Sequence, residues 1–483
     1  MNTTKNAKKS SHPAVTSVPA VIKSSQGRHE VITKSPPDSE VATYLATRLK
    51  DRLAFNIQIE SWYRLDEKLN FWKLATELQA KELIEPEIME LFNDSYTISK
   101  LNNITKLLVN RTKVNSWTTD SHLLPVKNGV LNINTCELYP YDSNYKFTWQ
   151  LPYDYQEDAQ CPVFLQWLHD CCHDDPDQIL RIHLCFRLLL SGIKKVQKFV
   201  EIIGKGKTGK STATRLMTKF IGENNTTISD IKYIQGRFET ASFKDKRLLL
   251  LPDQESWGSD LSILKNITGG DLLRYERKGK DAEVGFIADC LVVITANQPL
   301  TSSDKTTGLS RRRFPIYFDK EISQDDLDKW ESKGGIEKAM KNELPGILNW
   351  ALQLSETDVH KAIARFDANK TDCDLRLTLS TNYLAKWLNE CCIEQKEFET
   401  FTGTANDKHT EKAYANYLHW CDYSNIDKKI NLSNFGKNLL SLFPSLNKPF
   451  ERKKIPKGMV FIGFRLRREG DTEPYMFPNI GLD

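Results

Sequence analysis

The first part of the chain repeats apolar side chains at the spacing of a helix. Within residues 41–108, for example, Phe71, Leu74 and Leu78 recur every three or four positions, which places them on one face of a helix. Residues 161–192 show the same period. We therefore predict a mostly helical N-terminal region and a further helical segment directly before residue 196.

Strand signals follow in the middle of the chain. Residues 123–133 hold two short apolar runs around Asn128-Gly129, a dipeptide that favours a tight turn, and predict a hairpin. Residues 211–220 suit a helix. Further runs, short enough for buried strands, lie at residues 199–203, 246–255, 290–295 and 314–318. Together these elements predict an α/β fold.

The C-terminal third has a pattern of its own. Residues 412–423 and 433–443 suit helices, and residues 459–466 suit a strand that follows a Lys-Gly turn. This order fits a winged helix. Residues 353–380, which carry several charged side chains, look like a linker region.

Composition limits the compartment and the partners. The 483 residues allow about three domains, and 27% charged with 40% hydrophobic residues is typical of a soluble globular protein. No apolar run is long enough to span a bilayer, and the N-terminus lacks the apolar segment of a secretory signal, so we expect a cytoplasmic protein without membrane contact. Because the net charge is only +4, nucleic-acid contacts must come from local basic patches.

The N-terminal tail and the cysteines add less. Residues 1–40 are rich in Ser, Lys, Thr and Pro and predict a disordered basic tail, which either touches DNA transiently or is merely solvated. The ten cysteines form no CxxC pair and predict reduced thiols. Cys171, Cys172 and His173 are weak zinc candidates, because adjacent cysteines on a helix point in different directions.

A glycine-rich segment lies where the first buried strand meets the following helix. It reads Gly-Lys-Gly-Lys-Thr-Gly-Lys-Ser at residues 204–211, the spacing of a loop whose backbone N–H groups bind the phosphates of a nucleotide. In such a loop Lys210 reaches the β- and γ-phosphates of ATP and Ser211 ligates Mg²⁺. A glycine-rich surface turn is the alternative. The predicted nucleotide-binding residues are Gly204, Lys205, Gly206, Lys207, Thr208, Gly209, Lys210, Ser211 and Thr212.

Polar side chains follow two of the later strands. Asp253 and Glu255 come directly after a leucine-rich run. In phosphate-loop enzymes one such acid helps to hold Mg²⁺ and a second carboxylate orients the attacking water, and we assign these roles to Asp253 and Glu255. Asn297 follows the next strand and is a candidate to hydrogen-bond the γ-phosphate. An exposed acidic turn and ordinary turn chemistry are the alternatives.

Two basic clusters are candidates for contacts with phosphate. Arg311, Arg312 and Arg313 precede a strand, and an arginine presented to a neighbouring subunit's γ-phosphate would neutralise transition-state charge. The alternative for this cluster is a set of solvated arginines, and the alternative for the second cluster, described next, is a solvated basic hairpin. The second cluster, around the predicted wing, contains Lys448, Arg452, Lys453, Lys454, Lys457, Arg465, Arg467 and Arg468.

The order of these motifs resembles that of the superfamily III helicases, the ring-forming AAA+ motors of DNA viruses and mobile elements. The resemblance is specifically to their phage and plasmid primase-helicase branch. Lys-Asn-Gly-Val-Leu at residues 127–131, with residues 151–164, resembles the domain that precedes the motor there. Residues 343–352 resemble the segment after the arginine finger, so the resemblance covers roughly residues 120–355.

The resemblance implies a role for each motif. Lys210 and Ser211 belong to its Walker A site, Asp253 and Glu255 are its Walker B acids, and Asn297 is its sensor. Gln254 separates the two acids where many such motors have adjacent Asp-Glu, which leaves the catalytic base open. Arg311 and Arg312 are the finger candidates implied by the resemblance. The implied DNA contacts are Arg277, Lys278 and Lys280 in a channel hairpin and Arg452, Lys453, Lys454 and Lys457 in the C-terminal domain.

We therefore predict an ATP-dependent DNA helicase or translocase of a phage or mobile element. It would be an ATP hydrolase, in which a homo-hexameric ring uses ATP and Mg²⁺ at subunit interfaces and holds single-stranded DNA in its channel and duplex at its C-terminal domain. A separate primase is a candidate partner, because no polymerising primase domain fits before residue 120. The alternative function is an origin-binding initiator or loader that uses ATP as an assembly switch. A small-metabolite kinase would leave the basic C-terminal region unexplained.

The predicted fold class is α/β, an AAA+ P-loop ATPase core with a mostly helical region before it and a winged helix after it. The predicted domains are a disordered basic tail (1–40), a helical N-terminal region (41–120), a family-specific domain before the motor (121–195), the superfamily III AAA+ domain (196–355), a linker and helix (356–390) and a winged-helix DNA-binding domain (391–483).

Overall fold

The computed structural model describes most of the chain between residues 36 and 477. The described residues are 36–92, 95–114, 117, 120–191, 196–236, 238–254, 262–275, 283–300, 309, 311–332 and 334–477. The tail predicted at residues 1–40 lies almost wholly outside them. The chain divides into two compact units, which are Met1–Glu67 with Trp72–Trp117, and Lys68–Phe71 with Thr118–Asp483.

The first unit combines three helices with a small sheet. The helices are α1 (Asp38–Arg48), α2 (Glu77–Phe92) and α3 (Ile98–Arg111). The strands are β1 (Leu53–Asn56), β2 (Ser61–Asp66), β3 (Phe71–Ala75) and β4 (Lys113–Val114). They pair in the order β3-β2-β1-β4, with β1 antiparallel to β2 and parallel to β4. Apolar residues of all three helices form one core with β1 and β2.

The helical prediction for this region missed the sheet. Phe71 and Leu74, whose spacing predicts a helix, belong to β3, and only Leu78 of the three lies in a helix. The reason is tertiary, because Trp72 is fully buried in a second small cluster with Tyr63 while Phe71 is buried as well. A strand that is covered on both faces loses the simple alternation that would have marked it.

A three-stranded antiparallel sheet begins the second unit. It consists of β5 (Leu123–Val126), β6 (Gly129–Asn132) and β7 (Leu138–Tyr139) in that order. The hairpin predicted around Asn128-Gly129 is confirmed, with Val126 opposite Gly129. A Cβ at Gly129 would lie 2.4 Å from the carbonyl oxygen of Tyr139, so the close approach of β7 requires glycine.

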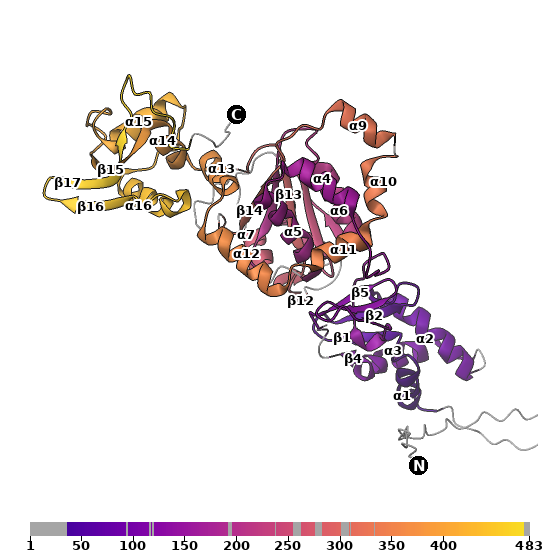
Figure 1. Ribbon diagram of the computed structural model, residues 1–483. Helices are drawn as coiled ribbons and strands as arrows, with labels where there is room; N and C mark the ends of the chain where they lie inside the picture. Colours follow the sequence, from indigo (N-terminus) through magenta and orange to yellow (C-terminus); the bar gives the residue numbers. More distant parts are fainter. Residues whose placement is uncertain are drawn as a thin grey trace, which may run out of the picture. The chain divides into compact units, whose positions relative to one another are not determined.

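A five-stranded parallel sheet follows, drawn at the centre of Figure 1. Its strands are β8 (Phe199–Ile203), β9 (Thr226–Ile228), β10 (Leu248–Gln254), β13 (Leu291–Ala296) and β14 (Arg313–Tyr317). The order is β14-β8-β13-β10-β9, and each neighbouring pair is parallel. The strands predicted from the four apolar runs are confirmed. Because the strands are parallel, their carboxyl ends share one edge of the sheet, where open α/β sheets bind ligands.

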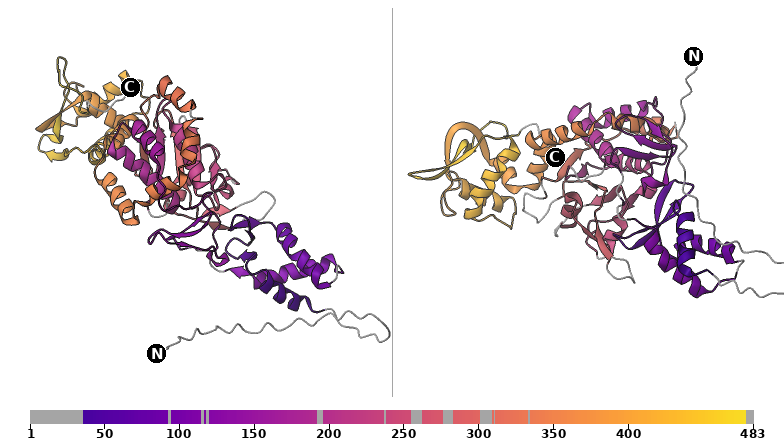
Figure 2. Two further views of the ribbon diagram at one scale, coloured as in Figure 1. Left: turned by 45° about the vertical axis from the view of Figure 1, so that its right-hand side comes forward. Right: turned by 90° about the horizontal axis from the view of Figure 1, so that it is seen from below.

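Both faces of this sheet are buried, and helices surround it in the views of Figure 2. Leu291 and Val293 join a main core to which four helices contribute along with α10 (Ile336–Lys341) and α12 (Glu356–Ala368), whereas Val292 and Ile294 point to the other face and are also fully buried. The four helices are α4 (Pro162–Cys172), α5 (Pro176–Ser191), α6 (Lys210–Ile221) and α11 (Leu344–Leu352). Shorter elements are α7 (Ser262–Gly269), β11 (Leu273–Tyr275), β12 (Glu283–Phe286), α9 (Gln324–Glu331) and α10 (Ile336–Lys341). The helices predicted at residues 161–192 and 211–220 are confirmed.

The predicted linker at residues 353–380 is wrong, because this segment forms α12 (Glu356–Ala368) and α13 (Asp372–Thr381). Ser355 and Asp358 form a capping box at the start of α12, and Phe366 is buried in the main core. Arg181 of α5 is fully buried and binds Asp374 of α13 at 2.6 Å. The Ser-x-x-Asp signature before an apolar period was available in the sequence.

The C-terminal elements have a core of their own. They are α14 (Tyr383–Cys391), β15 (Cys392–Phe401), α15 (Ala413–Tyr423), α16 (Leu432–Leu442), β16 (Glu451–Ile455) and β17 (Gly458–Leu466). The two helices and the strand predicted here are confirmed, and β15 was missed. The strands form an antiparallel sheet in the order β15-β17-β16. Trp387 of α14 packs in this core with Phe435 and Phe464, so a boundary at residue 391 would divide it.

Candidate functional site

The glycine-rich segment forms a loop between β8 and α6, which we call the phosphate loop (residues 204–209) after the contacts that its sequence predicts. A Cβ at Gly204 would lie 2.1 Å from the carbonyl oxygen of Phe318, whereas a Cβ at Gly206 would meet nothing within 4 Å. Gly209 is the N-cap of α6 and has a φ of 94°, a conformation that favours glycine. The loop is therefore tightly packed at its start and open at its middle.

Lys210, the first residue of α6, folds its side chain back over the phosphate loop. Its Nζ donates to the carbonyl oxygen of Lys205 at 2.6 Å, to that of Gly204, and to Oδ1 of Asn297 at 3.2 Å. Lys210 is buried, and burial lowers the pKa of its ammonium group, while the charge of Asp253 acts in the opposite direction. An anion beside this ammonium would stabilise its charge.

Asp253 lies near the carboxyl end of β10, at an irregularity in the pairing of β10 with β13. The register shifts between Leu251 and Gln254, and Asp253 has a φ of 49°. Its backbone N–H donates to Oγ1 of Thr295 at 2.9 Å. Such a bulge turns a side chain away from the regular alternation of the strand, and the Asp253 side chain is exposed at this edge.

Gln254, the residue between the two predicted acids, points into the protein. It is buried, its Nε2 donates to the carbonyl oxygen of Pro252 at 2.5 Å, and its Oε1 accepts from the backbone N–H of Ile231 at 3.3 Å. The glutamine therefore has a structural role on the inward side of the strand. Glu255, the second predicted acid, lies outside the described residues.

The carboxyl edge of the sheet brings several predicted residues together. The backbone N–H of Gly204 donates to the carbonyl oxygen of Ala296 at 3.2 Å, which joins the phosphate loop to the end of β13 just before Asn297. Ser211 and Asp253 are both exposed and supply the oxygen ligands that Mg²⁺ prefers. Among the described residues, no group of three or more His, Cys, Asp or Glu could hold a metal on its own. A Mg²⁺ ion here would therefore depend on phosphate oxygens as further ligands.

The three arginines have different surroundings. Arg313 donates from Nε and Nη2 to both carboxylate oxygens of Glu201 at 2.7 Å, and from Nη1 to the carbonyl oxygen of Leu300 at 2.9 Å. Glu201 is fully buried and also accepts from the backbone N–H of Leu300 at 2.8 Å. Such a bidentate, buried ion pair has its hydrogen bonds satisfied within the protein. Arg313 is thus committed to the fold.

Arg311 and Arg312 remain at the surface, at the amino end of β14. Arg311 is exposed and Arg312 is half-buried, with Asp271 among the charges that act on its guanidinium. Arg313 pairs with the first residue of β8, Phe199, whereas the phosphate loop follows the last residue of β8. Strand β8 is five residues long, which places its first and last residues about 13 Å apart. The arginines therefore lie at the opposite edge of the sheet from Lys210.

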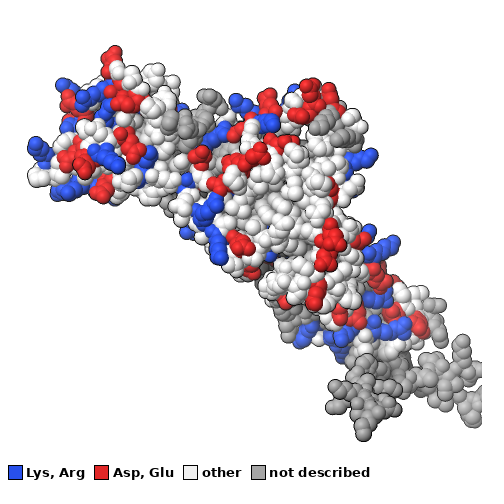
Figure 3. Space-filling model, viewed as in Figure 1, with Lys and Arg blue, Asp and Glu red and all other residues white. Residues whose placement is uncertain are grey.

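The C-terminal basic residues divide into paired and unpaired groups. Arg465 binds Asp471 and Glu473, and Lys448 binds Glu394. Arg467 donates to the carbonyl oxygens of three backbone groups. By contrast, Lys453, Lys454 and Lys457 of the β16–β17 hairpin are exposed, as is Arg468 further along the chain. Figure 3 shows Lys and Arg side chains, interspersed with acidic ones, on the C-terminal part of the chain.

Arg452 is packed against helix α16 rather than directed outward. A Cβ at Gly436 would lie 2.4 Å from its guanidinium carbon, and this carbon is 5.9 Å from the ring centre of Phe461.

Helix α16 itself was not among the predicted site residues. Its buried side carries Phe435 and Leu439, and its exposed polar side chains are Ser433, Asn434, Lys437, Asn438 and Ser441. The signal that could have found this polar side is the period of its apolar positions.

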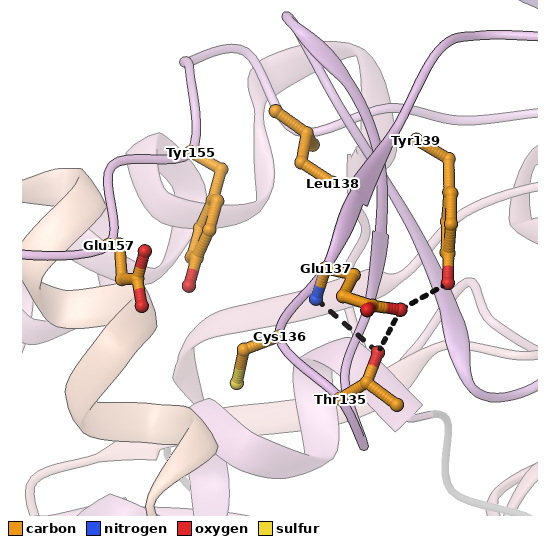
Figure 4. Close-up of a pocket in the computed structure, with 7 residues that line it drawn as sticks. All are labelled: Thr135, Cys136, Glu137, Leu138, Tyr139, Tyr155 and Glu157. Carbon is orange, nitrogen blue, oxygen red and sulfur yellow. Dashed lines mark hydrogen bonds between the residues drawn. The ribbon is translucent and has the colours of Figure 1, made fainter. Parts of the chain in front are cut away.

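A separate surface pocket of about 670 Å³ lies beside the β6–β7 turn. It is lined by Thr135, Cys136, Glu137, Leu138, Tyr139, Tyr155 and Glu157. Figure 4 shows the hydroxyls of Thr135 and Tyr139 turned toward the Glu137 carboxylate, at 3.2 Å and 2.5 Å. The hydrogen bond from the Tyr139 hydroxyl to Glu137 raises the pKa of the Tyr139 phenol. None of these residues belongs to the carboxyl edge of the parallel sheet.

The remaining sequence candidates have plain structural roles. The ten cysteines, all among the described residues, are free thiols. Cys171 and Cys172 are buried in the main core, and burial raises the pKa of each to about 12, which disfavours the thiolate that binds zinc. His173 ends α4 in a left-handed conformation. None of the helices in the described part of the chain is long and apolar enough to cross a membrane.

Fold and site together define an α/β protein with a parallel sheet and a strand, glycine-rich loop and helix at the carboxyl edge of that sheet. Residues 42–173 match the family described as D5 N terminal like, a region of primase-helicases, and residues 202–313 match a family of unknown function, DUF5906. The first match supports the resemblance to phage primase-helicases and begins well before residue 121, where the family-specific domain was predicted to start. The second spans the phosphate loop, Asp253, Asn297 and the arginines.

Among solved structures, the chain is similar to apo structures of the NrS-1 C-terminal region. One is 12% identical, with a TM-score of 0.45, and the similarity covers 87% of this chain and 98% of that chain. Another is 13% identical, with a TM-score of 0.46, and covers 88% and 100%.

Proposed function

We propose that this protein is an ATP hydrolase that acts on DNA as a helicase or translocase during replication of a phage or mobile element. The observation that carries the proposal is the hydrogen bond from Lys210 to Asn297 beside the phosphate loop, with Asp253 exposed at the same edge of the sheet. The match to the D5 N terminal like family supports the link to replication. The pocket beside the β6–β7 turn offers no comparable cluster of phosphate-binding groups.

The residues at the carboxyl edge fit a nucleotide with Mg²⁺. Lys210 would exchange the carbonyl oxygens of its own loop for phosphate oxygens, and the open backbone at Gly206 leaves room for them. Ser211 and Asp253 would hold Mg²⁺, which neutralises phosphate charge when bound. Asn297 would orient the γ-phosphate or the attacking water. Glu255 remains the candidate base.

An arginine from a second copy would complete the site. Arg311 and Arg312 lie too far from their own phosphate loop to contact a nucleotide there. A head-to-tail arrangement of copies can bring the arginine edge of one to the nucleotide edge of the next, and such an arrangement forms a ring when the rotation between copies closes. We therefore propose a homo-hexameric ring that hydrolyses ATP at its subunit interfaces, with charge neutralisation by the arginine.

The C-terminal domain is the proposed duplex-binding part. Its order of α14, β15, α15, α16, β16 and β17 supports the proposal of a winged helix. In this arrangement α16 would lie in the major groove, where Asn434 and Asn438 could contact bases. Lys453, Lys454 and Lys457 of the hairpin would contact phosphates. The channel contacts proposed for Arg277, Lys278 and Lys280 fall outside the described residues.

ATP turnover measured with and without single-stranded DNA tests the proposal. We expect hydrolysis that single-stranded DNA stimulates, and a loss of roughly 100-fold or more in Lys210→Ala, because this variant removes the phosphate contact without removing core volume. Absence of turnover in the wild type, or a wild-type rate in Lys210→Ala, would contradict it. ATP-dependent assembly without DNA-stimulated turnover would favour the initiator or loader instead.

A further inference from the structure

Residues at the start of β8 hold the backbone of the arginine triplet. Nζ of Lys198 donates to the carbonyl oxygen of Arg311 at 2.6 Å, and the backbone N–H of Phe199 donates to that of Arg312 at 2.9 Å. Two residues later, Glu201 holds Arg313 by the bidentate ion pair. The triplet is thus fastened to the strand that leads directly into the phosphate loop.

Lys198 is held in turn by Asp367 of α12. Lys198 is buried with 4% of its surface exposed, and its Nζ lies 2.6 Å from Oδ1 of Asp367. Burial lowers the pKa of Lys198, and the hydrogen bond with Asp367 acts in the opposite direction. An ammonium in such a place is costly unless its hydrogen bonds are made, so its position is tightly determined. The carbonyl group of Arg311 is one of the two partners that determine it.

Of the two surface arginines, Arg311 is the one available to a second copy. Its side chain is exposed, whereas the Arg312 guanidinium is half-buried near the end of α7, with Nη2 3.8 Å from the place of a Cβ on Gly269. The backbone of the exposed arginine is also the one that Lys198 holds.

We propose that Lys198 and Asp367 are positioning residues that hold Arg311 in place for the nucleotide site of a neighbouring copy. This inference rests on the proposed function and names the residues that would hold the arginine supplied to the neighbouring copy. Strand β8 then serves two active sites, since it carries the phosphate loop of its own subunit at one end and the arginine for the neighbour at the other. A shift of about 1 Å in a catalytic group can cost roughly 100-fold in rate, so the fixed backbone matters for hydrolysis.

The test is a mixing experiment with Lys198→Met, which keeps the length of the side chain and removes the amine. We expect this variant to bind ATP with wild-type affinity and to hydrolyse it roughly 10- to 100-fold more slowly. Adding Lys210→Ala, which has an intact arginine but a disabled pocket, should restore hydrolysis at mixed interfaces. Adding Arg311→Ala should restore nothing, because neither protein can then supply a well-placed arginine.

Arg247→Met is the matched control. Arg247 is also a buried cation directly before a central strand, and it donates to the carbonyl oxygens of Leu189 and Leu190, far from the triplet in sequence. Any loss of turnover in this control should not be restored by Lys210→Ala. If Lys210→Ala also restored hydrolysis by Arg247→Met, the inference would be overturned, because restoration would then follow from general destabilisation of either variant.

Asp367→Asn provides a second variant if Lys198→Met does not fold, since Asp367 is exposed. We expect a smaller loss with the same pattern of restoration. Two outcomes would refute the positioning role alone. One is a wild-type rate of hydrolysis in both variants. The other is that adding Lys210→Ala restores hydrolysis by Arg311→Ala but does not restore hydrolysis by these two variants. If Lys210→Ala also fails to restore Arg311→Ala, the shared site itself fails, and the proposed function with it.

Discussion

Basic residues that lie close in the sequence have different roles here, because their burial and their partners differ. Arg313 is satisfied by Glu201 and Leu300, and Arg311 is exposed. The same contrast separates Lys210, which lies over the phosphate loop, from Lys198, which supports a backbone carbonyl at the far end of β8. The role of each of these basic side chains therefore depends on its burial and on the end of strand β8 at which it lies.

His183 predicts a pH dependence of stability. It stacks on Trp350 with ring centres 3.9 Å apart, its Nε2 lies 2.6 Å from the backbone oxygen of that residue, and burial lowers its pKa from 6.5 to about 4. The folded protein thus binds fewer protons than the unfolded chain between these values, so stability falls as pH drops through this window. The expected loss at about pH 5 is at most about 2 kcal/mol.

Denaturant unfolding at about pH 7.5 and about pH 5 measures this contribution. We expect His183→Gln, which retains a donor, to show a smaller pH dependence than the wild type, and His360→Gln, at an exposed position, to match the wild type. Equal pH dependence in His183→Gln and the wild type would show that His183 does not titrate as argued.

At the scale of elements, the phosphate loop gives a matched pair of substitutions. We expect Gly204→Ala to disrupt nucleotide binding and to lower stability, because its Cβ would lie 2.1 Å from the carbonyl oxygen of Phe318. Gly206→Ala should change stability by only about 0.5 kcal/mol, since nothing lies within 4 Å of its Cβ. Thermal unfolding and ATP affinity, measured on both, check this. Equal effects of the two changes would contradict the loop geometry.

The β16–β17 hairpin predicts the salt dependence of duplex binding. Replacing Lys453, Lys454 and Lys457 together by Gln should reduce the slope of log affinity against log salt by up to about 3, because each lost phosphate contact removes about one unit. Lys448→Gln is the control, since Lys448 already binds Glu394 at 2.6 Å. An unchanged slope in the triple variant would remove the hairpin from the proposed interface.

Local signals in the sequence predicted the central elements well. A buried strand, a glycine-rich loop and an amphipathic helix follow one another within residues 199–221, so neighbours in sequence suffice to define them. The sheet of the first unit was missed because Trp72 and Tyr63 meet only after folding. The partner of Arg313 was equally hidden, since Glu201 lies 112 positions away and only strand register brings the two together.

At the scale of the whole molecule, one chain would combine the proposed ATP site, the arginine proposed for a neighbouring copy and a separate C-terminal core. The nucleotide edge and the arginine edge belong to one rigid strand, β8, so assembly and hydrolysis are expected to depend on each other. ATP turnover per subunit should therefore rise with protein concentration as copies associate. A concentration-independent rate would argue for a self-sufficient site.

The most direct test of the central claim is strand displacement on forked DNA with ATP and Mg²⁺, with Lys210→Ala run beside the wild type. We expect ATP-dependent displacement by the wild type and none by Lys210→Ala, although this variant should still bind the duplex through its C-terminal domain. Equal displacement by the two proteins, or tight DNA binding and ATP turnover by the wild type without any displacement, would contradict it.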